Sequence, residues 1–289
     1  MEQAGRRLRL AVIVHMPLAM EQGLDAEEAL RRELDEAWAL RHAHKIVTPS
    51  TAVSLYTVLK YGLAPGRVQT VRPGVRPGGV LRELAPGTDG TSLLCVANIT
   101  PVKGHTDLVY ALRQVADLPW TCDLVGGTVQ APQYVTELRE LIREQGLAGR
   151  ITLRGPLAGA DLARAYQTAD VLLLPSRWES FGLVTQEAIA SGVPVIASRV
   201  GGIPQAVGGD IRHGEHPALL LPPGDVHAWT EGIRLWLTAP ALRDRMRTAA
   251  RDRRRQLPDW RDTAAAVAPA FPASPFPPEA QLGTAGRKP

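Results

Sequence analysis

The sequence predicts an α/β protein with a complete doubly wound parallel sheet in its C-terminal part and a partial Rossmann-like domain in front of it. Two observations predict this class. After residue 90, short apolar runs typical of buried strands alternate with amphipathic helical stretches. Residues 1–78 show the same alternation but offer only about three strand-like runs, against the roughly five or six of an ordinary sheet.

The N-terminal part begins with an apolar run at 8–14, which predicts a buried strand, and continues with an amphipathic helix over 25–43. The alternation goes on with KIVTPS, TAVSLYTVLKYG and RVQTVRPG. The Pro/Gly-rich segment 71–79 predicts a linker. A sheet cut short in this way has an unprotected edge. We therefore expect either that something absent here completes the sheet or that the chain begins late.

The C-terminal part predicts at least five strands that alternate with helices. In chain order, the segments are TSLLCVANI, HTDLVYALRQVAD, WTCDLVGG, PQYVTELRELIREQG, RITLRG, AGADLARAYQTA, DVLLLPS, the helix after ESFG, VPVIAS, GGIPQAVGG, HPALLLPPGD and helices over 226–238 and 240–256. We accordingly divide the chain into a partial N-terminal domain with linker (1–78), a C-terminal Rossmann-like domain (79–256) and a C-terminal helix (257–271). The remaining Pro/Gly/Ala-rich tail (272–289) is expected to be disordered.

Composition excludes several classes of protein. Aromatic residues are only 5% of the chain, so base-stacking platforms for nucleic acid are not indicated. Apolar runs stay well short of the roughly 20 residues that span a bilayer. The net charge of +4 includes basic clusters at 6–9 and 253–255, which indicate solvated helix faces, with peripheral contact to acidic lipid or a phosphorylated ligand as the alternative. Two cysteines in apolar runs, Cys95 and Cys122, indicate a reducing cytoplasm.

Three stretches follow predicted strands, where doubly wound sheets bind their ligands. VANITPVKG carries Lys103 at a turn before a helix, a position suited to a phosphate. LVGGT carries Gly126 and Gly127, which let the backbone approach a ligand closely. The third stretch is LPSRWESFGLVTQE, at 174–187. We expect these stretches to border one site.

The third stretch combines a predicted helix start with two carboxylates. The free amides of Phe181, Gly182 and Leu183 at such a start favour an anion such as a diphosphate. If Glu179 and Glu187 were both helical, they would lie within about 80° of one face and about 12 Å apart along the axis. The paired carboxylates of a glycoside hydrolase stand only about 5 to 9.5 Å apart.

The wider spacing favours two hydroxyl-bearing groups on either side of a diphosphate, because a carboxylate accepts hydrogen bonds from vicinal hydroxyls. This indicates a nucleotide sugar. The alternative is that Glu179 caps the loop and Glu187 is a solvated helix residue. GxGxxG, Walker A, Asp-x-Asp and metal-spaced His/Cys/Asp patterns are absent from the sequence, so we expect neither a bound cofactor nor a metal ion. Lys103, arginines and helix ends would then neutralise the phosphates.

Several segments together resemble a known family. VKGHTDLVYAL, LVGG, ITLRGPL, ADVLLLPSRWESFGLVTQEAIASGVPVIASRVGGIPQAV and ALLLPPGD are similar to the retaining glycosyltransferases of the two-Rossmann-domain (GT-B) type, family 4, or glycosyl transferases group 1. The resemblance covers 80–270 in full and 8–78 as the latter part of the N-terminal domain. It implies a hexosyltransferase-like enzyme, with no metal.

The resemblance also implies roles for single residues. Glu179 would meet the hydroxyls of the donor sugar and Glu187 the ribose diol, while Lys103 would neutralise the diphosphate. The amides of Phe181, Gly182 and Leu183 would face the distal phosphate or sugar, and Leu153–Gly155 would border the base. His15 would lie near the reacting sugar. The alternative role of His15 is to cap the end of a strand. The implied reaction transfers a sugar from a nucleoside diphosphate to an unknown acceptor hydroxyl with retention, and the leaving diphosphate helps deprotonate the acceptor.

Three departures from the family pattern bear on activity. The family commonly has Gly-Arg ahead of the lysine, where this chain has Ala97 and Asn98. We therefore expect a weaker diphosphate site unless another arginine, such as Arg177, replaces the missing one. The first N-terminal strands are absent, and GIPQ stands where GxPE is usual. The alternatives to an active transferase are an impaired nucleotide-sugar-binding module and, third, an epimerase of similar build.

Overall fold

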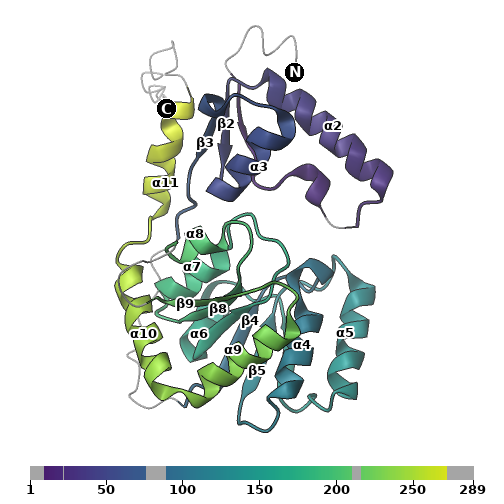
Figure 1. The fold of residues 1–289 in the computed structure, drawn as a ribbon, viewed down its shortest axis with the longest axis vertical. Coiled ribbons are helices and arrows are strands. Elements are labelled where there is room, and N and C mark those ends of the chain that lie inside the picture. Colours follow the sequence, from purple (N-terminus) through teal and green to yellow (C-terminus); the bar gives the residue numbers. More distant parts are fainter. Residues whose placement is uncertain (1–9, 22, 76–88, 210–215, 272–289) are drawn as a thin grey trace, which may run out of the picture.

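The computed structural model describes residues 10–21, 23–75, 89–209 and 216–271. Figure 1 shows two parallel sheets, one above the other, and each is covered by helices. The second half of the predicted linker, from residue 76 on, and the predicted disordered tail at 272–289 lie outside the described residues. The predicted α/β class is confirmed.

The smaller sheet is formed by the N-terminal part of the chain and has the order β1-β2-β3, all parallel. Its strands are Ala11–Ile13, Lys45–Thr48 and Val68–Thr70, in chain order, and its helices are α2 (Ala26–His42) and α3 (Thr51–Tyr61), with short 3-10 turns η1 (Leu18–Met20) and η2 (Pro65–Arg67). Ser50 starts α3, because its side chain accepts a hydrogen bond from the amide of Val53. The three predicted strands are all present, but the prediction that the first one is buried was wrong, because β1 lies at the edge of the sheet and its Ile13 is 61% exposed.

The larger sheet has six parallel strands in the order β6-β5-β4-β7-β8-β9. In chain order they are β4 (Ser92–Val96), β5 (Thr121–Val125), β6 (Ile151–Gly155), β7 (Val171–Leu174), β8 (Val195–Ser198) and β9 (Ala218–Leu221). The prediction of at least five strands is confirmed. Cys95 and Cys122 lie on the adjacent strands β4 and β5 as buried free thiols, and burial raises the pKa of Cys95 to about 12.

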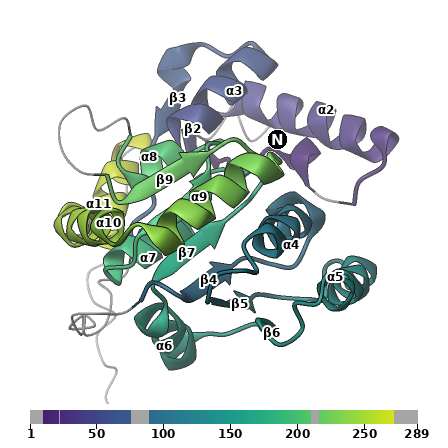
Figure 2. The same ribbon diagram turned by 60° about the horizontal axis from the view of Figure 1, so that its bottom comes forward.

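Helices cover both faces of this sheet (Figure 2). One apolar cluster packs α4, α5 and α9 against one face, and a second packs α6, α7 and α8 against the other. The helices are α4 (His105–Gln114), α5 (Pro132–Glu144), α6 (Gly159–Thr168), α7 (Leu183–Ala190), α8 (Ile203–Val207), α9 (Val226–Thr238) and α10 (Pro240–Arg254), with η3 (Pro101–Lys103) before α4. Because both faces of the sheet are covered, the strand residues on each face are buried, and the strands are therefore continuous apolar runs in the sequence.

The C-terminal helix returns to the small sheet. A capping box at Asp259 starts α11 (Trp260–Val267), and η4 (Ala268–Ala270) follows. The Gln69 side chain on β3 donates to the Ala266 carbonyl at 2.9 Å, and Ala270 packs with Val47 and Val71. The first and last described segments of the chain therefore form one unit, as Figure 1 shows.

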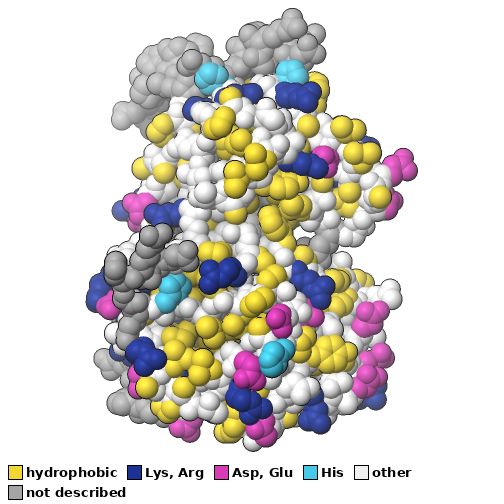
Figure 3. Space-filling model, viewed as in Figure 1, with side chains coloured by type: hydrophobic (Ala, Val, Ile, Leu, Met, Phe, Trp, Pro, Cys, Tyr) yellow, Lys and Arg dark blue, Asp and Glu magenta, His cyan; other side chains and the backbone are white. Residues whose placement is uncertain are grey.

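The order of the large sheet reverses between β4 and β7. The chain builds outward from β4 to β6 and then returns to place β7 on the other side of β4. The loops that follow β4 and β7 therefore diverge at this point, where open α/β sheets bind ligands. Both loops face the small sheet across the narrow waist of the molecule, where hydrophobic side chains gather (Figure 3).

Candidate functional site

A cavity of about 590 Å³ lies between the two sheets. Its upper wall is formed by the ends of β1–β3, and its lower wall by the loops after β4, β5, β6 and β7. Residues of α11 close one side. The lining comprises Ile13, His15, Val47, Thr48, Pro49, Val71 and Pro73 above, Val96, Ala97, Asn98, Lys103, Val125, Gly126, Gly127, Pro156, Leu157 and residues 179–184 below, and Trp260, Thr263 and Val267 at the side.

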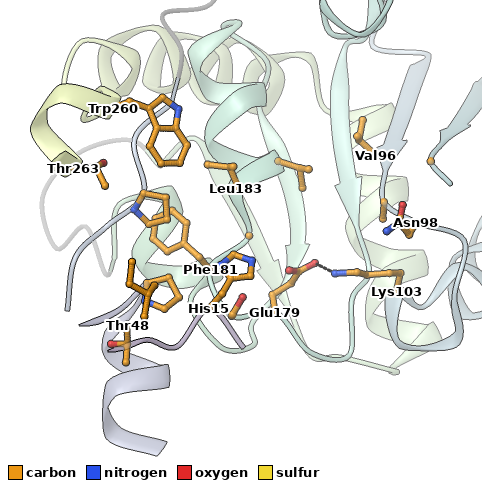
Figure 4. Close-up of a pocket in the computed structure, with 18 of the residues that line it drawn as sticks. His15, Thr48, Val96, Asn98, Lys103, Glu179, Phe181, Leu183, Trp260 and Thr263 are labelled. Carbon is orange, nitrogen blue, oxygen red and sulfur yellow. Dashed lines mark hydrogen bonds and ion pairs between the residues drawn. The ribbon is translucent and has the colours of Figure 1, made fainter. Parts of the chain in front are cut away.

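Lys103 and Glu179 meet in this cavity, although they are 76 residues apart in the sequence. The Lys103 Nζ lies 2.6 Å from Glu179 Oε1, and the Ser176 hydroxyl donates to the same oxygen at 2.9 Å (Figure 4). The two charged side chains are 23% and 12% exposed. Each comes from one of the two loops that flank the reversal of strand order. A cation and a carboxylate are thus presented together to whatever fills the cavity.

The close packing of these loops depends on Gly104. This residue has φ +71° and starts α4, and a Cβ there would fall 2.1 Å from the Pro175 carbonyl oxygen. A side chain would therefore separate the two loops and their charges. The glycine that follows the lysine in the sequence is explained by this contact.

Helix α7 starts at Leu183, with Gly182 before it at φ +84°. Phe181, Gly182 and Leu183 line the cavity, so the predicted helix start does face the site. Glu179, however, precedes the helix by four residues. The estimate of a shared helical face with Glu187 was therefore wrong, because only Glu187 is helical.

Glu187 lies in the second turn of α7 and does not line the cavity described above. The Tyr166 hydroxyl on α6 donates to Glu187 Oε2 at 2.9 Å. Tyr166 itself is buried, and burial together with the charge of Glu187 raises the pKa of its hydroxyl well above the usual value. Sequence reasoning missed this tyrosine, since nothing in the pattern of α6 distinguishes it.

The paired glycines bring the β4 and β5 loops into contact. A Cβ on Gly126 would fall 1.9 Å from the Ala97 carbonyl oxygen. The Gly127 amide donates to Asn98 Oδ1 at 3.2 Å, and the Asn98 amide group donates to Gln130 at 3.2 Å. Asn98 thus supports the loop backbone here, in the place where the family commonly has an arginine.

Two predicted site positions are displaced from the cavity. Leu153 and Gly155 lie on β6 and do not line it, whereas the next two residues, Pro156 and Leu157, do. Arg177 forms a bidentate pair with Asp107 on α4, with its Nη2 3.0 Å from Oδ1 and its Nε 3.1 Å from Oδ2. This arrangement does not support the hypothesis that Arg177 takes the place of the missing arginine.

Lys103 is the one Lys or Arg that lines the cavity within the described part of the chain. His15 reaches the same cavity from the end of β1, and Figure 4 shows its ring pointing into the space beside Glu179. Behind Lys103, the His105 side chain is fully buried. Burial, assisted by the nearby positive charge of Lys103, lowers the pKa of His105 to about 4, so this imidazole is neutral at neutral pH.

The described residues contain neither a metal-binding cluster nor a membrane-spanning helix. In residues 10–21, 23–75, 89–209 and 216–271, no group of three or more His, Cys, Asp and Glu side chains is arranged to hold a metal ion. The helices in these same ranges are all too short or too polar to cross a membrane.

Comparison with known proteins gives a consistent result. Residues 82–253, more than half of the chain, match the family described as glycosyl transferases group 1. A D-inositol 3-phosphate glycosyltransferase from Kineococcus radiotolerans is 33% identical in an alignment of 268 positions that covers 86% of this chain and 61% of that protein. Its counterpart from Thermobifida fusca is 32% identical over 83% of this chain and 57% of that protein. The chain thus spans about 60% of the length of these curated relatives.

Solved structures show the same fold. Sucrose-phosphate synthase from Thermosynechococcus elongatus superposes with a TM-score of 0.77 at 26% identity, over 91% of this chain and 67% of that one. Anabaena HepE, solved with UDP and glucose, has a TM-score of 0.75 at 22% identity, over 91% and 71%. The two sheets therefore have the expected GT-B arrangement, and the chain belongs to the group 1 glycosyltransferases.

Proposed function

We propose that this chain binds a nucleoside-diphosphate sugar and transfers the sugar to an acceptor hydroxyl with retention of configuration, as family 4 enzymes do. The observation that carries the proposal is the Lys103–Glu179 pair inside the cavity, next to the start of α7. A diphosphate needs positive charge and a sugar needs acceptors for its hydroxyls, and the two groups stand 2.6 Å apart.

The donor is placed by the charges and amides that line the cavity. Lys103 and the amides of Phe181, Gly182 and Leu183 would bind the diphosphate, because a helix start favours anions. Glu179 and His15 would then hold the hydroxyls of the donor sugar. Glu187, oriented by the Tyr166 hydroxyl, would bind the ribose diol.

The nucleotide base would lie near the end of β6, by Pro156 and Leu157. UDP is the first probe to use, since HepE was solved with UDP and with UDP-glucose.

The step follows from this placement. The bond between the anomeric carbon and the distal phosphate oxygen breaks, and its electron pair stays on the diphosphate. The acceptor oxygen bonds to the anomeric carbon on the same face, and its proton passes to a leaving phosphate oxygen. Lys103 and the α7 amides stabilise the charge that develops on the diphosphate. The proposal uses no metal ion, since these groups supply the neutralisation, and it places the protein in the cytoplasm with its nucleotide donor.

Asn98 favours a second candidate, a nucleotide-sugar-binding module with little turnover. The uncharged Asn98 side chain already hydrogen-bonds to the Gly127 amide and to the Gln130 side chain. With Arg177 paired to Asp107, Lys103 is the one cation among the described lining residues that can stabilise the leaving group. Turnover distinguishes the candidates, because both bind the donor.

Calorimetric titration with UDP tests the shared part of the proposal. Lys103→Ala should weaken UDP binding by about 1.5 to 3 kcal/mol, or roughly tenfold to a hundredfold, since it removes a charge-assisted contact. Arg177→Ala is the matched control and should change UDP affinity less than about twofold. Equal losses in the two variants would refute the assignment of the anion site to Lys103. Release of glucose from UDP-glucose, followed over hours, then separates the enzyme from the binding module.

A further inference from the structure

Ser50, at the start of α3 in the small sheet, lies next to the loop that carries Glu179 in the large sheet. We propose that Ser50 is a positioning residue that holds this loop in the geometry required for the donor sugar. The inference rests on the proposed function for the identity of the ligand. It is carried by one hydrogen bond between the two halves of the chain and by the packing around that bond.

The Ser50 side chain is fully buried and has two distinct bonds. Its oxygen accepts from the Val53 amide at 3.2 Å, which caps α3. Its hydroxyl proton is donated to the Ser180 carbonyl at 2.6 Å, across 130 residues of sequence. A hydroxyl has only one proton. Capping therefore uses the lone pair of the oxygen, and bridging uses the proton, so the two roles can be separated chemically.

The loop is held from below by two glycines. The Gly202 amide donates to the Glu179 carbonyl at 3.1 Å, and a Cβ on Gly201 would fall 1.7 Å from that same oxygen. A Cβ on Gly202 would fall 2.5 Å from the Ser180 carbonyl oxygen and 2.8 Å from Ser50 Cβ. The peptide after Glu179 is thus enclosed between this glycine turn and Ser50.

A second contact joins the same two elements. The Thr51 amide, one of the free donors at the start of α3, donates to Gln205 Oε1 on α8 at 2.8 Å. The large sheet therefore helps to cap a helix of the small sheet. Ser50 and Thr51 together fix the position of α3 relative to the Glu179 loop.

The consequence concerns the sugar rather than the nucleotide. Glu179 lies one residue before the bridged carbonyl, whereas Lys103 and Glu187 are held by other elements. Loss of the bridge should therefore disturb the contact with the sugar more than the contacts of Lys103 and Glu187 with the nucleoside diphosphate. The Phe181 amide, which shares the bridged peptide group, is the one diphosphate contact expected to weaken as well. In the bound state, Ser50 would couple the position of the small sheet to the position of Glu179, which contacts the sugar.

The test compares Ser50→Asp with Ser50→Ala. Aspartate is a good N-cap but, when ionised, has no proton to donate, so Ser50→Asp keeps the cap and removes the bridge, whereas Ser50→Ala removes both. Two measurements are made on the full chain. These are amide hydrogen exchange over residues 178–185 and over α3 without ligand, and calorimetric affinities for UDP and UDP-glucose.

We expect both variants to exchange faster over 178–185, while only Ser50→Ala exchanges faster over α3. Both should weaken UDP-glucose binding roughly fivefold to tenfold and UDP binding by a smaller factor, about twofold to threefold, through the Phe181 amide. Gln205→Glu retains the acceptor for the Thr51 amide and should match the wild type, whereas Gln205→Leu should show a smaller loss of the same kind.

Three outcomes would overturn the inference. Ser50→Asp may behave as the wild type in both measurements, which would leave capping as the only role of Ser50. Faster exchange over 178–185 with an unchanged ratio of the two affinities would make the bridge purely structural. An equal loss of UDP and UDP-glucose affinity would place its effect on the nucleotide. If the wild type bound neither ligand, the proposed donor would fail instead, and the exchange data alone would show whether Ser50 holds the loop.

Discussion

The two sheets differ in how completely they are enclosed. The six-stranded sheet has helices on both faces, and Leu172, Leu173 and Trp229 are fully buried. Among the described residues, the three-stranded sheet has α2 and α3 on one face and only α11 and η4 on the other. Seven of the twelve exposed large hydrophobic side chains in the described ranges lie between residues 13 and 59. The small sheet therefore gains less from its own core and depends more on contacts with the rest of the chain.

The two parts also contribute different groups to the site. Lys103, Glu179 and Glu187 all belong to the large sheet, where packed loops fix their positions. The small sheet provides His15 and, through Ser50, a hold on the Glu179 loop. The groups proposed to bind the nucleotide thus lie on the better enclosed part, and three predictions test this contrast.

The largest effect is expected from the same substitution made in each part. Leu172→Ala, on β7, removes a fully buried side chain and should lower the free energy of unfolding by about 2 to 5 kcal/mol. Leu59→Ala, on α3, removes one that is 72% exposed and should change it by less than about 0.5 kcal/mol. Denaturant unfolding measures both. Similar losses would show that Leu59 is covered by something in solution.

A pH effect in the mildly acidic range is expected from His105 in the large part. The pKa of His105 is lowered from 6.5 to about 4, so the unfolded chain takes up this proton first as the pH falls. Neutral His105 therefore costs no stability above about pH 6.5. As the pH falls from there to about 4, the free energy of unfolding decreases, and the total loss at pH 4 is roughly 3 kcal/mol. His105→Phe should flatten this part of the stability curve, because neither ring nitrogen makes a well-formed hydrogen bond to another described residue. An unchanged slope would contradict the assignment.

The smallest effect is expected in the small part. The Tyr61 hydroxyl donates to the buried Glu36 carboxylate at 2.5 Å, and the Leu18 amide donates to the same oxygen at 3.0 Å. Tyr61→Phe should therefore cost about 1.5 to 3 kcal/mol of local stability. Amide exchange should become faster in α2 and α3 and remain unchanged in β4–β8. Equal acceleration in both sheets would show that they unfold as one unit, and Tyr110→Phe, at an exposed position of α4, is the control.

Much of the fold could be predicted because its signals are local. A strand enclosed on both faces must be apolar throughout, so β7 and β8 are recognisable as VLLL and VIAS. The capping bond from the Val53 amide to the Ser50 side chain is also a local signal, because the two residues are three positions apart. The error about Glu179 and Glu187 arose from one local detail, since the helix begins four residues later than a shared face requires.

The kinds of groups in the site, and the strands they follow, could be read from the residues: a lysine after β4, paired glycines after β5 and a carboxylate before α7. Which of these groups meet depends on the folded chain. Lys103 reaches Glu179, Arg177 is held by Asp107, Ser50 holds Ser180, and α11 joins the small sheet. Composition and periodicity carry information about residues that are neighbours within a few positions. These contacts instead depend on strand order and join side chains that are 70 to almost 200 residues apart in the sequence.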